Sequence, residues 1–406
     1  MPGAPPDGLP VPPDGRLEPG AVAELRGSSL GIYVHVPFCA TRCGYCDFNT
    51  YTAAELGGGG ARDRYAGLAI QEIKLARLVL GDAAPAVSTV FFGGGTPTVL
   101  PPADLAAILG AIGAEFGLAP GAEVTTEANP ESVDQRSLAR LREAGFTRIS
   151  LGMQSAAEHV LKVLDRSHTP GRPERCVAWA RAVGFAHVSL DLIYGTPGET
   201  AKDWDLSVRS ALDAGPDHIS AYALIVEEGT RLAARIRRGE LDPPDDDEMA
   251  DRYLAADDLL TAAGLRWYEI SNWAAGPGSA CRHNLLYWTG GNWWGVGPGA
   301  HSHVGGTRWW NVRHPAAYSA RITAGVSPGQ AREVLSEAER GAERIMLETR
   351  LAAGVPVSAL GHAGRRAAEV AAADGLADAG ALGAGRVVLT RPGRLLADAV
   401  VRGLTG

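Results

Sequence analysis

Short apolar runs alternate with longer amphipathic stretches along the first half of the chain. The apolar runs are rich in β-branched and aromatic residues, which predicts strands, and the amphipathic stretches have helical spacing. The predicted strands are Ile32–Val36, Val87–Phe92, Glu123–Glu127, Arg148–Leu151, His187–Leu192 and His218–Leu224. The predicted helices lie near residues 62–80, 102–116, 135–144, 155–165, 173–184 and 202–214. Six such βα units predict an α/β fold whose parallel sheet is covered by helices and curls into a partial barrel.

The regular alternation stops after residue 225. An acidic stretch, Asp242–Glu248, begins a further helix near residues 247–263, and the segment 273–313 is too rich in Gly and Trp for a core helix. Near the C-terminus the pattern predicts two helices, a small hairpin formed by Gly383–Leu389 and Gly393–Leu395, and a last helix. This part is expected to form a small, mostly helical, winged-helix-like domain.

The expected organisation has four parts. A Pro- and Gly-rich segment predicts a flexible N-terminal arm, followed by the barrel, a Gly/Trp-rich extension and the C-terminal domain. Their expected bounds are 1–30, 31–265, 266–330 and 331–406.

Composition narrows the classes of function. The 406 residues carry a formal net charge of −8, which argues against a broad surface for nucleic acid or anionic lipid. The N-terminal segment lacks the basic and apolar regions of a signal peptide, and no apolar run reaches the length of a transmembrane helix. We therefore expect a cytoplasmic protein that does not bind nucleic acid.

Three of the five cysteines stand in one short segment directly after the first predicted strand. Loops at the carboxyl ends of strands hold the chemistry of parallel barrels. In the spacing Cys39-x3-Cys43-x2-Cys46, three thiolates can ligate three irons of a 4Fe–4S cluster and leave the fourth iron open to a small molecule. The alternative is a zinc site, but no fourth Cys or His follows within the loop.

Polar residues and glycines mark the ends of further strands. Glu127, Gln154 and Asp191 stand at strand ends, and Arg166 follows the helix after Gln154. The run Gly93–Gly95 ends the second strand, where missing side chains can let backbone amides approach a ligand. Each feature alone could be only a helix cap, a surface pair or a turn. Together, at one end of a barrel, they favour a binding site.

Several longer strings carry a family resemblance. The cysteine spacing at the opening of a βα barrel resembles the radical SAM superfamily, in which a reduced cluster cleaves S-adenosylmethionine (SAM). The strings Tyr33-Val-His-Val-Pro-Phe-Cys39, Gly93-Gly-Gly-Thr-Pro-Thr98, Asp191-Leu-Ile-Tyr-Gly195 and Gly295-x-Gly-x-Gly-Ala-His-Ser302 resemble the oxygen-independent coproporphyrinogen III oxidase family. The resemblance runs from about residue 31 to the C-terminus and implies a partial (β/α)6 radical SAM barrel.

The resemblance also implies roles for individual residues. Cys39, Cys43 and Cys46 would hold the 4Fe–4S cluster. Tyr33 would lie near the cluster, and further positions match those that bind the cofactors in the family. These cofactor-binding residues are Tyr33, Tyr45, Gly94, Gly95, Thr96, Glu127, Gln154, Arg166 and Asp191.

Two features separate the branches of this family. The oxidases have a fourth cysteine two positions after the third, where this chain has Phe48. The string His283-Asn-Leu-Leu-Tyr-Trp288 matches the HNxxYW pattern of HemW-type haem chaperones. This resemblance implies that the protein binds haem, with His283 as a candidate ligand, and transfers it to respiratory or other haem proteins. The neighbouring aromatic residues could face the macrocycle, or could only pack the open side of the barrel.

Other functions remain open from the sequence. One is an oxygen-independent coproporphyrinogen III dehydrogenase that makes protoporphyrinogen IX by radical chemistry, and another is a radical SAM reaction such as methyl transfer. The expected partners are haem and haem-receiving proteins of the respiratory chain. A homodimer and peripheral membrane association through a partner are further expectations.

Overall fold

One long sheet organises the molecule. The computed structural model describes residues 7–58, 60–166 and 168–406. Within these residues the main sheet has twelve strands, in the order β14-β13-β12-β11-β1-β4-β5-β6-β7-β8-β10-β9. The strands from β11 through β1 to β8 pair in parallel. Their bounds are β1 Leu30–Val36, β4 Val87–Gly94, β5 Leu118–Ala128, β6 Arg148–Gln154, β7 His187–Tyr194, β8 His218–Ala223 and β11 Asn292–Val296. At the edge next to β8, β10 Asn272–Ala274 and β9 Arg266–Glu269 pair antiparallel.

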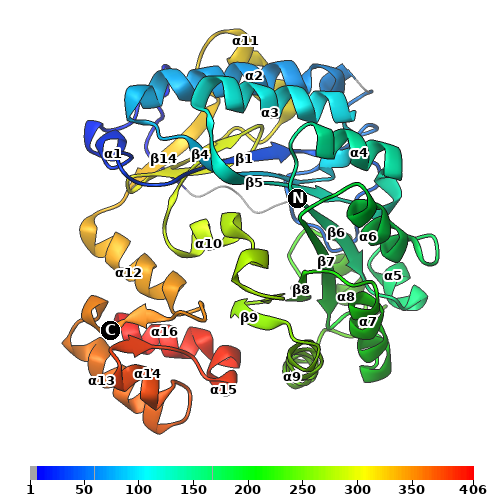
Figure 1. The fold of residues 1–406 in the computed structure, drawn as a ribbon, viewed down its shortest axis with the longest axis vertical. Coiled ribbons are helices and arrows are strands. Elements are labelled where there is room, and N and C mark those ends of the chain that lie inside the picture. Colours follow the sequence, from blue (N-terminus) through cyan, green and yellow to red (C-terminus); the bar gives the residue numbers. More distant parts are fainter. Residues whose placement is uncertain (1–6, 59, 167) are drawn as a thin grey trace.

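Six helices lie where the sequence indicated, but α5 and α6 both follow β6, so together they follow five of the six predicted strands. They form a layer over the outer face of the curved sheet (Figure 1). Their bounds are α2 Gly60–Leu80, α3 Pro102–Phe116, α4 Gln135–Glu143, α5 Glu158–Val163, α6 Arg172–Ala182 and α7 Ala201–Asp213. Pro at the first turn or a side-chain cap fixes several of their starts, for example the capping box of Thr200 and Asp203 on α7. The predicted partial barrel is confirmed.

Side chains alternate strictly along the barrel strands. In β6, Ile149 and Leu151 are fully buried in the main apolar core, whereas Arg148 and Ser150 line the interior of the barrel. Successive strand residues point to opposite faces, so one face packs on the helices and the other lines the lumen. The same alternation holds in β7 and β8, and it makes the lumen polar.

The Gly/Trp-rich extension continues the same sheet. β11 pairs in parallel with β1, and β12 His301–Val304, β13 Thr307–Asn311 and β14 Gly329–Val334 add antiparallel strands. Gly295 is required here, since a Cβ on it would stand 2.2 Å from the carbonyl oxygen of His301. The segment also contains one short helix, α10 Arg282–Trp288, and α11 Pro315–Thr323 follows β13.

The described part of the predicted flexible arm is packed against this extension. Leu9 exchanges backbone hydrogen bonds with Arg332 of β14, and α1 Pro19–Ala23 leads to Leu25, which is fully buried. Glu18 pairs with Arg332 at 3.0 Å. Residues 7–30 are therefore held by apolar packing and by backbone hydrogen bonds to β14, where the sequence predicted a flexible arm. Residues 1–6 of that predicted arm lie outside the described residues.

The C-terminal part has its own small apolar core, centred on Val355, Ala368 and Val387. It is mostly helical, as predicted, with α12 Glu337–Glu348, α13 His362–Ala373, α14 Ala379–Gly383, α15 Arg391–Leu395 and α16 Ala397–Thr405. The predicted hairpin is wrong in its pairing. β16 Arg386–Val387 pairs with β15 Val355–Pro356, before α13, and residues 393–395 belong to α15, whose start is capped by Thr390.

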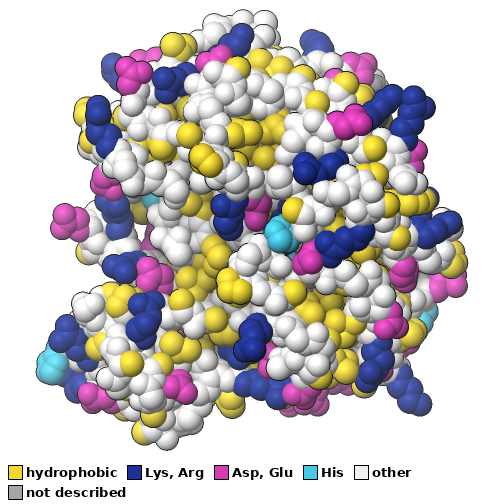
Figure 2. All heavy atoms as spheres, viewed as in Figure 1, with side chains coloured by type: hydrophobic (Ala, Val, Ile, Leu, Met, Phe, Trp, Pro, Cys, Tyr) yellow, Lys and Arg dark blue, Asp and Glu magenta, His cyan; other side chains and the backbone are white. Residues whose placement is uncertain are grey.

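Helix α9 Asp246–Ala262 joins the barrel to this C-terminal part. Asp257 of α9 forms ion pairs with Arg391 and Arg394 of the C-terminal part. No helix of the described residues is both long and apolar enough to span a membrane. On the face shown in Figure 2, acidic and basic side chains are interspersed over all layers, and hydrophobic side chains show between them.

Candidate functional site

A cavity of about 520 Å³ opens at the carboxyl ends of the barrel strands and continues into the lumen. It brings together most of the residues predicted as cofactor-binding or cluster-ligating. Those that line it are Cys39, Cys43, Tyr45, Cys46, Gly94, Gly95, Thr96, Glu127, Gln154, Arg166 and Asp191. Tyr33 and His283 are the two predicted residues outside its lining.

The loop that carries the three cysteines, which we call the cysteine loop, begins and ends at two paired short strands. β2 Phe38–Cys39 pairs with β3 Tyr51–Thr52, so the loop leaves and returns to the same point. All three thiols are free of disulfides and half-buried. Thr96 Oγ1 lies 3.9 Å from Cys39 Sγ, and Arg166 Nη1 lies 3.6 Å from Cys43 Sγ. Burial raises the pKa of Cys39 to about 11, with the Thr96 hydroxyl acting in the opposite direction.

These donors suit an iron–sulfur cluster. Three soft sulfur ligands on one loop beside a cavity, with a guanidinium near Cys43 to balance thiolate charge, match what such a cluster requires. No three His, Cys, Asp or Glu side chains of the described residues gather closely enough around one point to hold a single metal ion. Three thiolates that bind three different irons need no such common point.

The glycine run has a different role from the predicted one. Gly95 N–H donates to the carbonyl oxygen of Val36 at 2.8 Å, and Thr96 N–H donates to that of Phe38 at 2.8 Å. A Cβ on Gly95 would lie 2.6 Å from the Phe38 oxygen. The amides of Gly95 and Thr96 therefore bind the cysteine loop rather than a ligand. The expectation of free amides is corrected, although Gly94, Gly95 and Thr96 do line the cavity.

Two carboxyl groups stand across the cavity. Gly94 N–H donates to Glu127 Oε2 at 3.1 Å, and Ser150 Oγ lies 2.9 Å from both carboxyl oxygens of Asp191. Burial, followed by the nearby Asp191, raises the pKa of Glu127 to about 8, while the Gly94 N–H opposes the rise. Burial also raises the pKa of Asp191. A cationic ligand such as SAM would relieve this repulsion.

Arg166 and Gln154 also line the part of the cavity near the carboxyl ends of the strands, which we call its upper part. Arg166 Nη2 donates to the carbonyl oxygen of Gly152 at 2.7 Å, and its Nε has no partner among the described residues. Gln154 ends β6 with a φ of +67°, the left-handed region that residues other than Gly rarely adopt. Such strained positions concentrate at functional sites, so the backbone of Gln154 supports its assignment to the site.

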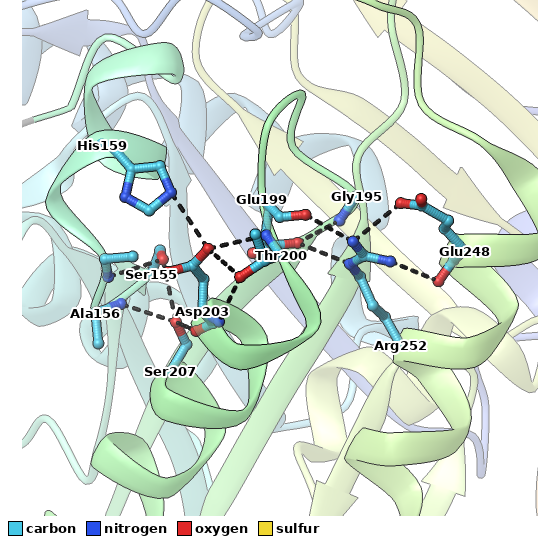
Figure 3. Close-up of polar contacts among 11 residues, drawn as sticks. Ser155, Ala156, His159, Gly195, Glu199, Thr200, Asp203, Ser207, Glu248 and Arg252 are labelled. Carbon is cyan, nitrogen blue, oxygen red and sulfur yellow. Dashed lines mark hydrogen bonds and ion pairs between the residues drawn. The ribbon is translucent and has the colours of Figure 1, made fainter.

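A polar network fixes the loops after β6 and β7 (Figure 3). Glu199 accepts a hydrogen bond from Gly195 N–H at 2.8 Å and pairs with Arg252 of α9 at 3.4 Å. Ser207 Oγ accepts from Ala156 N–H at 3.0 Å. Since these loops follow β6, which ends at Gln154, and β7, which carries Asp191 and ends at Tyr194, the network positions two strands of the site.

Tyr33 lies behind the cysteine loop. Its hydroxyl group is 3.0 Å from His35 Nδ1, and His35 Nε2 is 2.9 Å from the carbonyl oxygen of Asn49. Burial lowers the pKa of His35 to about 4, so the imidazole is neutral at physiological pH. Tyr33 thus reaches the loop through His35, without touching the cavity.

His283 is buried in the barrel wall and is 1% exposed. Its Nδ1 is 2.8 Å from Thr89 Oγ1, its Nε2 is 2.8 Å from the Tyr287 hydroxyl group, and its ring stacks on Phe91. Burial lowers its pKa to about 3. In this conformation neither nitrogen is free for an iron. Haem binding by His283 gains no support from the geometry and stays a prediction.

A second histidine of the extension is better placed to ligate iron. His303 is half-buried, and the centroid of its ring lies 5.3 Å from that of Trp293. Trp293 in turn packs edge-on against Tyr287. Nδ1 of His303 is 2.8 Å from the carbonyl oxygen of Gly291, and its Nε2 has no hydrogen-bond partner among the described residues. A ring N–H donated to a backbone carbonyl is how metal-ligating histidines are commonly oriented.

The sequence reasoning missed the residues deeper in the lumen. Arg148, Ser150, Ser189, His218 and Ser220 all line the cavity. They occupy alternate positions of three strands, so a search for period-two polar residues within the predicted strands could have found them.

Comparisons with known proteins show which proteins this chain resembles in sequence and in fold. The family model of the Radical SAM superfamily matches residues 33–211. A Mycobacterium tuberculosis protein named heme chaperone HemW is 53% identical over 96% of this chain and 98% of its own length. The protein of the same name from Bacillus subtilis is 34% identical over 80% of this chain and 84% of its own length.

Among solved structures, the coproporphyrinogen III oxidase HemN of Escherichia coli, described as a radical SAM enzyme, superposes with a TM-score of 0.81. It covers 95% of this chain and 92% of its own, at 22% identity. At that identity the similarity shows the fold alone.

Proposed function

Because the chain belongs to the HemW family of haem chaperones, we propose that it binds haem and transfers it to respiratory or other haem proteins. The observation that carries this proposal is the 53% identity to the M. tuberculosis HemW across nearly the whole of both chains. Phe48 agrees with it. It is 63% exposed at the mouth of the cavity and supplies no sulfur where the oxidases have a fourth cysteine.

The cavity would hold the two cofactors of the radical SAM fold. Cys39, Cys43 and Cys46 would ligate a 4Fe–4S cluster, which supplies an electron when reduced. The paired carboxyl groups of Glu127 and Asp191 would face the cationic part of SAM. The remaining residues in the upper part of the cavity would orient it: Tyr45, Gly94, Gly95, Thr96, Gln154 and Arg166.

The haem iron would be bound on the aromatic surface of the extension, formed by Tyr287, Trp293 and His303. His303 offers an oriented ring with a free Nε2. His283 is the residue indicated by the motif, and it would need to give up its Tyr287 hydrogen bond to reach an iron. The geometry therefore favours His303 as the ligand.

Haem titration of the anaerobically reconstituted protein tests this function. We expect saturable binding with a shifted Soret band at one haem per chain. His303→Gln, whose amide can still donate to Gly291, is expected to change the Soret band, while His301→Gln on the same strand serves as the control. Loss of the band only in His283→Gln would assign the ligand to the motif histidine. A wild-type protein without a Soret shift would reject the haem function.

The alternative function is coproporphyrinogen III dehydrogenase, since the E. coli protein that shares this fold is named a coproporphyrinogen III oxidase. Anaerobic incubation of the reconstituted protein with coproporphyrinogen III, SAM and a reductant should give no protoporphyrinogen IX. Formation of that product would support the dehydrogenase instead.

The remaining parts of the proposal concern where the protein acts. A reduced cysteine loop suits the cytoplasm, where thiols are kept free of disulfides. Haem-receiving proteins of the respiratory chain would then draw it to the membrane surface through a partner. A homodimer would be tested by light scattering with and without the cluster.

A further inference from the structure

The lumen continues below the residues proposed to hold SAM. We call this lower part the inner chamber, and it lies toward the amino ends of the barrel strands. Its lining residues are Thr125, Arg148, Ser189, His218, Cys281 and Asn284. None of them belongs to the set that the family resemblance assigns to the cofactors.

Arg148 is a buried cation without an ion pair. Arg148 is 1% exposed, and no carboxylate oxygen of the described residues lies within 4.0 Å of its guanidinium nitrogens. Nη1 donates to the carbonyl oxygen of Ser279 at 2.7 Å, and Nη2 has no partner within the described chain. Arg is almost never fully buried unless paired, and Asp191 acts on this cation only from beyond ion-pair distance.

Thr125 gives a second, independent sign of a missing ligand. It is fully buried, it lines the same chamber, and its Oγ1 has no hydrogen-bond partner among the described residues. The large majority of buried side-chain polar atoms in proteins have a hydrogen-bond partner. Two unsatisfied groups on neighbouring strands, one of them charged, point to a ligand that accepts hydrogen bonds.

The other polar groups of the chamber are already engaged. His218 Nδ1 is 2.7 Å from Ser189 Oγ and its Nε2 is 2.8 Å from the Tyr268 hydroxyl group. Cys281 Sγ lies 3.6 Å from Glu123 Oε1, and burial raises the pKa of this thiol to about 12. These groups shape the chamber without competing for the ligand of Arg148.

We propose that the inner chamber binds the carboxylate group of a small organic acid, held by Arg148 Nη2 and the Thr125 hydroxyl group. A guanidinium fork matches a carboxylate geometrically. One Arg balances one negative charge, and the nearby carboxyl groups of Asp191 and Glu123 would repel a doubly charged anion such as phosphate. The bound acid would extend upward into the same cavity as SAM.

This inference rests on the proposed function only in placing SAM in the upper part of the cavity. The haem site on the extension has no part in it. The binding of a small acid and the binding of haem can therefore succeed or fail separately.

Thermal unfolding of the full chain, with its cluster reconstituted, tests the inference. Sodium propionate serves as the probe and propionamide, its neutral analogue, as the control. A ligand that binds only the folded state raises the unfolding midpoint saturably with its concentration. We expect this for propionate and not for propionamide. Thr125→Val should weaken the propionate dependence by about tenfold, equivalent to about 1.4 kcal/mol.

Arg148→Met separates a binding role from a structural one. If the guanidinium awaits an anion, removing the buried charge should raise the midpoint of the unliganded protein and abolish the response to propionate. SAM binding, followed by equilibrium dialysis, should be unchanged.

Three outcomes would overturn the inference. The first is an unfolding midpoint of ligand-free Arg148→Met below that of wild type, which would mean that Arg148 stabilises the fold through its hydrogen bond to Ser279. The second is loss of SAM binding in Arg148→Met, which would assign the chamber to the cofactor. The third is an equal response to propionate in wild type and Thr125→Val. If Arg148→Met does not fold, Arg148→Lys takes its place, and unchanged propionate binding in that variant would also count against the fork geometry.

Discussion

Oε2 of Glu127, at the end of β5, accepts a hydrogen bond from the backbone N–H of Gly94, at the end of β4, at 3.1 Å. This contact links the glycine run to the acidic side of the cavity. Burial and the nearby Asp191 raise the pKa of the Glu127 carboxyl group to about 8 against the effect of this hydrogen bond, so the group is mostly protonated at neutral pH.

SAM binding should therefore depend on pH. A cationic ligand favours the ionised carboxylate, so binding below pH 8 must release a proton from Glu127. We expect SAM affinity to rise as the pH increases from 6 to about 8 and to level off above that pH. Equilibrium dialysis of the anaerobic protein measures it. Glu127→Gln should bind SAM more weakly and without this pH dependence, and an unchanged profile in Glu127→Gln would contradict the assignment.

Each of the three loop cysteines should be needed for the cluster. Cys39→Ser, Cys43→Ser and Cys46→Ser should each lose the 4Fe–4S absorbance and most of the iron and sulfide after reconstitution, because two thiolates cannot retain the cubane. Cys176→Ser is the matched control, since Cys176 is buried in the main core, away from the loop, and its Sγ donates a hydrogen bond to the carbonyl oxygen of Pro130 at 3.4 Å. A triple serine variant that still takes up four irons and four sulfides would refute the cluster assignment.

Gly95→Ala should disturb the cysteine loop. The added Cβ would meet the carbonyl oxygens of Phe38 and Val36 at 2.6 and 2.9 Å, so the loop must move. We expect the variant to fold and to lose cluster more quickly in air, as measured by the decay of its visible absorbance. Gly113→Ala in α3, with open space around its Cβ, should keep the cluster and gain up to about 1 kcal/mol. Equal decay rates in both variants would contradict this role for Gly95.

Thr89→Val should destabilise the fold because it leaves Nδ1 of the buried His283 without a partner. We expect a loss of about 1–3 kcal/mol in the free energy of unfolding, measured with denaturant. Ser88→Ala is the control, since Ser88 is half-buried on the same strand and bonds only to the carbonyl oxygen of Leu30. If Thr89→Val proves as stable as wild type, His283 is not fixed by this hydrogen bond and becomes freer to act as a ligand.

Glu199→Gln should change how stability depends on pH. Burial raises the pKa of Glu199 to about 7, above its value of 4.5 in the unfolded chain. Its contribution to stability is therefore complete below pH 4.5 and is lost as the pH rises to about 7, by roughly 3 kcal/mol at about 1.4 kcal/mol per pKa unit. Glu199→Gln keeps an acceptor for Gly195 N–H, and Arg252 keeps its pair with Glu248. Subtracting the two stability profiles isolates the effect, and a flat difference between pH 4.5 and 7 would contradict it.

The sequence alone determined the barrel and the position of its chemistry. Alternating strand and helix patterns identified six βα units, because apolar periodicity reflects which face of an element is buried. The three cysteines could be predicted as ligands because ligand spacing on one short loop is a local property, and they line the cavity. Glu127, Gln154 and Asp191 could be predicted to lie together because the carboxyl ends of strands in a parallel barrel meet at one rim, and all three line the cavity.

Tertiary structure decided what depends on residues far apart in the chain. The extension joins the main sheet because β11 pairs with β1, more than two hundred residues earlier, and no local pattern specifies that partner. For the same reason the glycine amides were assigned to a ligand before the structure showed the cysteine loop bound to them. The unpaired state of Arg148, the burial of His283 and the free Nε2 of His303 follow from their neighbours in space. The burial of a side chain and its hydrogen-bond partners depend on residues from several segments, so no single segment of the sequence specifies them.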